Sequence, residues 1–186
     1  GGARPLNEVA EEQSVDLDAL MEELITVYEK TEATDDMKVW TNSSSEEIIE
    51  HIINEYHRPL HEELKALSPY VTKVAKVHGM NHPELIKVYE LFYEVKKELI
   101  EHTEKEEAIS FPNIMKLEAN PNIENKEEII EEIRVLEAEH DHAGDIMKQI
   151  RKITNEYALP VGACGTYTMV YKRLEMLESD LFRHVH

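Results

Sequence analysis

The chain of 186 residues is long enough for one domain of ordinary size with a small appendage, and 41% hydrophobic residues supply a core. Its formal net charge of −19 argues against nucleic acid and anionic membrane surfaces as partners, because no basic stripe is present to neutralise phosphates. Six glycines, seven prolines and a single cysteine exclude a turn-rich β fold and an internal disulfide, and we expect a helical, cytoplasmic protein without membrane spans.

The N-terminal part of the chain differs in pattern from the rest. A stretch that begins near Ser14 has helical periodicity, and a polar linker follows between about Thr34 and Ser45. We therefore predict a short helical N-terminal appendage with its linker over residues 1–40, and a second domain over residues 41–186.

Four long amphipathic patterns follow, with apolar residues in alternating steps of four and three. Pro59 lies inside the first pattern and predicts a kink near His57, and Phe111-Pro112 begins the end of the second. Short connections between such helices predict an all-α, antiparallel up-down four-helix bundle. The predicted helices cover residues 46–77, 83–109, 126–157 and the stretch from the break at 160–165 to the end.

Each predicted helix carries a histidine on its apolar seam. A buried imidazole must be hydrogen-bonded or bound to metal, because an uncompensated polar group in a core costs about 1–3 kcal/mol. Because neighbouring helices alternate in direction, the four positions can share one level of the bundle. Glu106 lies one turn after the second of them, on the same helix face. The pattern predicts one metal site at these histidines: His57, His102, His140 and His184.

The types of side chain narrow the choice of metal. Imidazoles with a carboxylate suit iron, manganese or zinc, and no thiolate is placed to hold a sulfur-bound cluster. Ferritin-like sites use Glu-x-x-His with the glutamate first, whereas here His102 precedes Glu106 by four residues. Such a histidine-rich set leaves coordination positions open for a small molecule.

Several short motifs occur in a characteristic order along the chain. The motifs are Glu55-Tyr56-His57, Val77-His78-Gly79, His102-Thr103-Glu104-Lys105-Glu106-Glu107 with Phe111-Pro112, Glu139-His140-Asp141-His142-Ala143-Gly144 and Ala163-Cys164-Gly165-Thr166. Over about residues 46–186 this ordered set resembles the di-iron iron–sulfur cluster repair family, also called Repair of Iron Centers proteins, whose bundle is hemerythrin-like. The stretch of residues 1–8 resembles the tail of that family's small N-terminal domain.

The resemblance implies a centre of two non-haem iron ions. Glu106 would bridge the two ions together with an oxo or hydroxo group. The family's last ligand is a glutamate four residues after the fourth histidine, so the C-terminal end, at His186, is expected to be truncated. His78 also matches a family position, at a helix end. The implied ligands in this chain are His57, His102, Glu106, His140 and His184.

The resemblance also implies a function in the repair or protection of iron–sulfur clusters under nitrosative or oxidative stress. Iron could be donated to damaged or apo iron–sulfur proteins, or nitric oxide could react at the ferrous pair, and only the second role would make the protein an enzyme. The partners would be these proteins and the gases NO and O₂, with a homodimer as one allowed assembly.

Two alternatives stay open, and three residues outside the ligand set bear on the interpretation. Oxygen-carrying hemerythrins have a histidine where this chain has Gly144, which counts against a reversible dioxygen carrier or sensor. We expect Gly144 to leave an access path and an exchangeable coordination position. A structural bundle without metal is the other alternative. We interpret Cys164 as a small buried residue, because no local motif places a base beside it, and His142 as a surface residue.

Overall fold

A computed structural model describes residue 40 and residues 43–185, without the side chains of residues 137 and 183–185. The chain divides into two units, Gly1–Ser44 and Ser45–His186, and the description that follows concerns the second. Residues 45–185 contain helices and no strand, which confirms the all-α prediction. The predicted N-terminal appendage lies outside the described residues, apart from residue 40, and stays a prediction.

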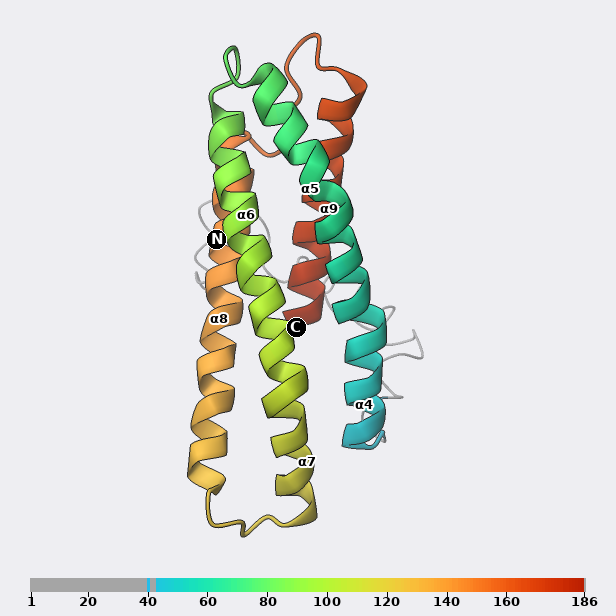
Figure 1. Cartoon of the computed structure of the whole chain (residues 1–186), viewed down its shortest axis with the longest axis vertical. Coiled ribbons are helices and arrows are strands. Elements are labelled where there is room, and N and C mark those ends of the chain that lie inside the picture. Colours follow the sequence, from blue (N-terminus) through green and yellow to red (C-terminus); the bar gives the residue numbers. More distant parts are fainter. Residues whose placement is uncertain (1–39, 41–42, 186) are drawn as a thin grey trace, which may run out of the picture. The chain divides into compact units, whose positions relative to one another are not determined.

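The first column of the bundle joins α4 (Ser45–His51), the π-helical segment η1 (Ile52–His57) and α5 (Arg58–His78), as Figure 1 shows. The π-helical segment η1 lies at His57, where the sequence predicted a kink. The column ends at Gly79, where an added Cβ would lie 2.4 Å from the carbonyl oxygen of Ala75. Only glycine allows so close an approach of the chain to the last turn of α5.

The second column joins α6 (Glu84–Lys105), the π-helical segment η2 (Glu106–Ser110) and α7 (Phe111–Ala119). The prediction that this helix begins to end at Phe111-Pro112 was wrong. Pro112 lies in the first turn of α7, a position where a helix tolerates the missing N–H. The helical column therefore continues to Ala119, and the predicted loop at Asn120 follows it.

The last two columns are α8 (Lys126–Ile153) and α9 (Gly165–Val185). The prediction extended α8 to residue 157, but Asn155, Glu156 and Tyr157 have φ angles of 52°, 59° and 58°. Their left-handed backbone ends the helix, because an α-helix needs negative φ. The N–H of Tyr157 donates to Oγ1 of Thr154 at 3.1 Å and so closes the turn.

The four long helices form a closed ring in which α5 and α8 each pack against both α6 and α9. Neighbouring columns run in opposite directions (Figure 1), which confirms the up-down four-helix bundle. The main apolar core begins on α5 at Leu64, after His57, and ends on α6 at Leu99, before His102. At the level of the histidines, polar side chains therefore replace the apolar core.

Candidate metal centre

Two π-helical turns carry residues of the candidate site. The N–H of Arg58 donates to the carbonyl of Ile53, and the N–H of Phe111 donates to that of Glu106, five residues earlier in each case. A proline follows each wide turn, but Pro69 lies inside α5 without one, so proline alone does not cause them. π-Helical turns are concentrated at functional sites, and these two carry His57 and Glu106.

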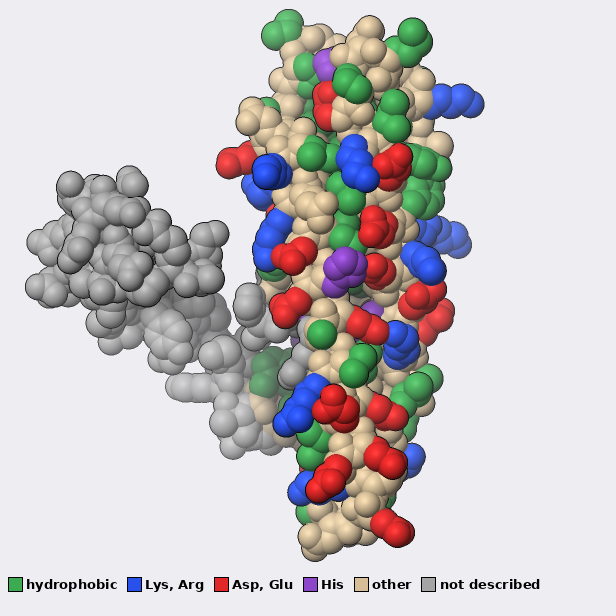
Figure 2. Space-filling model, turned by 90° about the vertical axis from the view of Figure 1, so that its left-hand side faces the viewer, with side chains coloured by type: hydrophobic (Ala, Val, Ile, Leu, Met, Phe, Trp, Pro, Cys, Tyr) green, Lys and Arg blue, Asp and Glu red, His purple; other side chains and the backbone are tan. Residues whose placement is uncertain are grey.

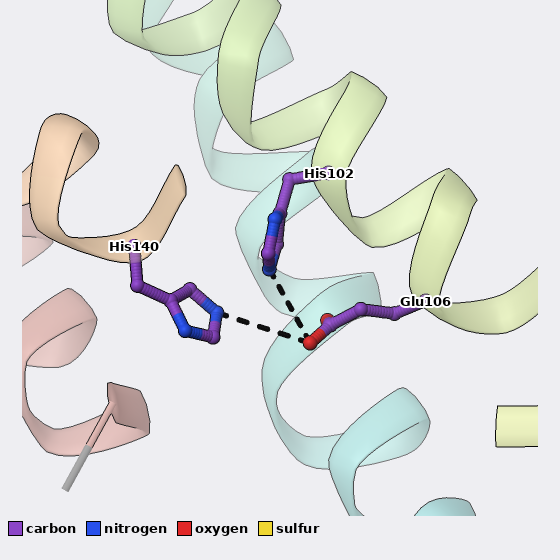
Figure 3. Close-up of side chains that lie close together, drawn as sticks. All are labelled: His102, Glu106 and His140. Atoms are coloured by element: carbon purple, nitrogen blue, oxygen red, sulfur yellow. Dashed lines mark ion pairs between the residues drawn. The ribbon is translucent and has the colours of Figure 1, made fainter. Parts of the chain in front are cut away.

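Glu106 is the hub of the site. Its Oε2 lies 3.1 Å from Nε2 of His57. Its Oε1 lies 3.3 Å from Nε2 of His102 and 3.8 Å from Nε2 of His140. Figure 3 shows the His102 and His140 side chains, from α6 and α8, converging on one oxygen of Glu106. Ligand atoms of these three residues all lie within 4.8 Å of one another.

Two outer carboxylates orient the imidazoles. Nδ1 of His57 donates to Oε1 of Glu107 at 2.8 Å, and Nδ1 of His102 donates to Oε2 of Glu139 at 3.0 Å. Glu139 is itself held by the Nζ of Lys105 at 2.5 Å. A neutral imidazole that donates through Nδ1 keeps its lone pair on Nε2, which is the arrangement of a metal ligand. In both histidines this atom faces Glu106.

The ligand atoms of the site are largely buried, and their negative charge needs a cation to balance it. His57 and His102 are 1% and 4% exposed, and the Glu106 side chain is 12% exposed. Within the described part of the chain, Nε2 of His102 and Oε2 of Glu106 are buried and make no hydrogen bond. Leaving a buried polar group unsatisfied costs about 1–3 kcal/mol. A cation among these atoms would satisfy them, and imidazole with carboxylate fits iron, manganese or zinc.

The acid–base properties of the cluster agree with its geometry. Burial alone would raise the pKa of Glu106, but the close imidazoles of His102 and His57 favour its charged form more strongly and lower this pKa to about 2. Burial alone would lower the pKa of His57 and of His102, but the neighbouring glutamates outweigh burial and raise both pKa values. Burial and the charge of His102 lower the pKa of His140. The hub carboxylate is therefore ionised at neutral pH, and protons or a metal ion must compensate it.

The structure brings together most of the ligands proposed from the sequence: His57, His102, Glu106 and His140 lie around one point. The side chain of His184 lies outside the described residues, so its role stays a prediction. Glu107 and Glu139 were missed as partners of the histidines. Both stand within the quoted motifs, directly beside Glu106 and His140, and this adjacency was the only signal that could have identified them.

His78 does not belong to this cluster. It lies at the far end of α5, about 30 Å from His57 at 1.5 Å per residue. Its Nε2 lies 3.2 Å from Sγ of Cys164, and its ring stacks on Tyr167. Cys164 is exposed, so its interpretation as a small buried residue was wrong. The histidine that approaches it comes from a distant part of the sequence.

A cavity of about 340 Å³ opens beside the site between α6 and α8. His102, Glu139 and His140 line it from the bundle side, and Glu98 and His142 also line it. Gly144 does not line this cavity. It is buried, and an added Cβ would lie 3.4 Å from the ring of Phe182. A cavity therefore reaches the site on the α6–α8 face, and the access path and open coordination position at Gly144 stay predictions.

Comparison with known proteins places these features in context. The family model of the Hemerythrin HHE cation binding domain matches residues 48–186. None of the described helices is both long and apolar enough to span a membrane.

Similar proteins from three organisms extend the likeness to the whole chain. The iron-sulfur cluster repair protein ScdA of Staphylococcus haemolyticus is 34% identical over 186 residues, covering 100% of this chain and 81% of that protein. A probable iron-sulfur cluster repair protein of Haemophilus influenzae is 32% identical over 186 residues, with 100% and 80% covered. The iron-sulfur cluster repair protein YtfE of Cronobacter sakazakii is 34% identical over 192 residues, with 100% and 79% covered.

Proposed function

Because this chain belongs to the hemerythrin HHE cation-binding family, among the iron–sulfur cluster repair proteins, we propose that it holds two iron ions and uses them to restore damaged iron–sulfur clusters. One observation carries the proposal. The ionised, buried carboxylate of Glu106 is approached by three imidazole nitrogens and by no Lys or Arg side chain among its described ion pairs. A metal cation is the partner that this arrangement lacks.

The two oxygens of Glu106 support two ions rather than one. Oε2 faces His57, whereas Oε1 faces His102 and His140. A carboxylate whose oxygens face different nitrogen ligands can bridge two metal ions. In this proposal His57 belongs to one ion, His102 and His140 belong to the other, and His184 is added from the family resemblance.

Iron bound here would supply redox chemistry and binding of small molecules. The chain's own residues hold and orient the ligands: Glu107 and Glu139 fix the rings of His57 and His102 through their Nδ1 protons. Imidazoles dominate the set, and neutral ligands offset less of the ions' charge than carboxylates would. Such a set is compatible with release of ferrous iron as cargo, and the cavity beside His140 gives that iron a path.

Transfer of iron to an apo iron–sulfur protein tests the donor role. The iron-loaded chain, the His102→Ala variant and a control, His82→Ala, are each mixed anaerobically with the apo protein and a sulfide source. His82 is a matched control because it pairs with Glu84 at the start of α6, away from the site. We expect the wild type and the control to restore cluster absorbance and His102→Ala to fail. Equal restoration by all three chains would overturn the donor role.

Reaction with nitric oxide is the second candidate, and the cavity favours it. Its lining includes His102 and His140, so a diatomic molecule could reach the iron without displacing the core. Two ferrous ions held by these residues would supply the two electrons that, with two protons, convert two NO molecules into nitrous oxide and water. Nitrous oxide released when nitric oxide is added to the ferrous chain would therefore support this role, and its absence would contradict it. A dioxygen adduct that forms and dissociates without oxidising the iron would favour the carrier alternative instead.

A further inference from the structure

A second cluster of histidine and glutamate lies on the surface of α6 and α8. Glu94 and Glu98 are one turn apart on α6, and His142 approaches them from α8. Ligand atoms of the three lie within 4.8 Å of one another, and Nε2 of His142 is 3.1 Å from Oε1 of Glu98. An imidazole with two carboxylates is a set that borderline divalent cations accept. The sequence placed His142 on the surface, and its side chain is 59% exposed.

The charges around this cluster favour a cation. Figure 2 shows a histidine at mid-height on the side where α8 lies, with acidic side chains around it. The lysines nearby on α6 are engaged elsewhere, because Lys97 pairs with Glu101 and Lys105 pairs with Glu139. The two carboxylates therefore keep a negative local potential, which concentrates cations at the surface.

The cluster also lies where the cavity begins. Glu98 and His142 line the same cavity as His102 and His140 of the proposed iron centre. Nε2 of His102 is buried behind this lining, 3.3 Å from Oε1 of Glu106, so the cavity reaches the wall of the inner centre. The shared cavity and the imidazole of His142 separate the cluster from an ordinary acidic surface patch.

We propose that Glu94, Glu98 and His142 form an outer site for a divalent cation, through which Fe²⁺ enters and leaves the inner centre. The transit role rests on the proposed iron function, whereas the cation site itself does not. Exposure of His142 and Glu94 leaves room for water on the bound ion, so binding is weaker and exchange is faster than at the buried centre. A weak outer site of this kind is suited to transient binding of Fe²⁺ while the inner centre is loaded or releases its iron.

Binding of Mn²⁺ tests the outer site. The full chain and the double variant Glu94→Gln/Glu98→Gln are titrated with Mn²⁺, and free Mn²⁺ is measured from its EPR signal. The matched control is Glu127→Gln/Glu131→Gln, which removes two exposed carboxylates at the same spacing from α8. We expect the wild type and the control to bind one more Mn²⁺ per chain than the double variant. Equal binding by all three would overturn the outer site. Because the inner centre is the same in each chain, this difference does not depend on whether the protein repairs clusters.

The rate of ferrous loading tests the transit role. Metal-free chain is mixed with Fe²⁺ anaerobically, and uptake is followed with a chelator that reports the iron left free. Removing the local negative potential should slow loading of the double variant by about tenfold relative to the control variant. The same loading rate in both would overturn the transit role. A chain that loads quickly but restores no clusters would contradict the repair function and leave the outer site standing.

Discussion

Two glutamates inside the same bundle, the buried Glu178 and the partly buried Glu106, have opposite surroundings. Glu178 is 3% exposed, and its carboxylate accepts hydrogen bonds from Nε of Arg151 at 3.1 and 2.8 Å and from the Tyr157 hydroxyl at 3.0 Å. Glu106 faces only imidazoles, and its Oε2 makes no hydrogen bond among the described residues. A permanent cation and a phenol complete the first network. The carboxylate of Glu106 instead needs protons or metal ions as partners. What separates a structural carboxylate from a metal site is therefore whether its oxygens have hydrogen-bond donors in the protein, and not how deeply it is buried.

Both regions depend on irregular backbone. The left-handed turn after α8 carries Tyr157 to Glu178, at a cost of order 1–3 kcal/mol for each residue in that conformation. The π-helical segments η1 and η2 carry His57 and Glu106 in the same way. In each case a departure from the regular helix delivers a polar side chain to the interior.

The largest expected effect is on iron binding by Glu106→Gln. An amide keeps the shape of the side chain but removes the bridging charge, so iron affinity should fall by more than about 100-fold, beyond the loss typical of a residue that only orients a ligand. Competition with a ferrous chelator measures the change. The metal-free variant should unfold at the same denaturant concentration as the metal-free wild type. Iron affinity equal to the wild type would contradict the role of Glu106.

The converse substitution at the structural carboxylate should affect folding instead. Glu178→Gln removes the ionised partner that Arg151 contacts most closely, leaves only Glu175 at 3.8 Å, and should lower the free energy of unfolding by about 2–3 kcal/mol. Urea denaturation of the metal-free chain measures this loss. Iron stoichiometry should stay at the wild-type value, and a variant with normal stability but no iron would reverse the comparison between the two glutamates.

A smaller effect is expected at the outer carboxylate of His57. Glu107→Gln keeps a hydrogen-bond acceptor for Nδ1 but removes its charge, so iron affinity should fall by about 10–100-fold. Glu104→Gln is a suitable control, because Glu104 is an exposed glutamate on the same helix. If both variants bound iron equally well, Glu107 would not act through His57.

The smallest expected effect is at Tyr157. Tyr157→Phe removes one hydrogen bond to Glu178 and leaves the Arg151 contact, so the free energy of unfolding should fall by about 1 kcal/mol. Iron content should not change, because the network is separate from the histidines. A loss above that of Glu178→Gln would show that the phenol, and not the guanidinium, holds the buried carboxylate.

The sequence alone predicted the helices and the common level of His57, His102 and His140, because a period of 3.6 residues records which face is buried. It did not predict the π-helical turns, since the one-position shift that an extra residue makes in the pattern is hard to separate from the ordinary mixture of three- and four-residue steps. The early end of α8 was missed because Asn155, Glu156 and Tyr157 are not glycines, the usual signal of a left-handed backbone.

Contacts between distant parts of the chain were the other source of error. Glu139 is one of 39 acidic residues, and only its approach to His102 across the bundle distinguishes it from the others. Cys164 and His78 are likewise brought together by the fold, from the start of α9 and the end of α5. Sequence patterns within a single helix contain no record of such pairs.

Elemental analysis after anaerobic ferrous loading tests the central claim most directly. The claim is that the carboxylate of Glu106 and its imidazoles bind metal. They would then differ from the carboxylate of Glu178, whose hydrogen bonds are all supplied by the protein. We predict two iron ions per chain that survive desalting. A wild-type chain that retains no iron after the same loading would contradict the account.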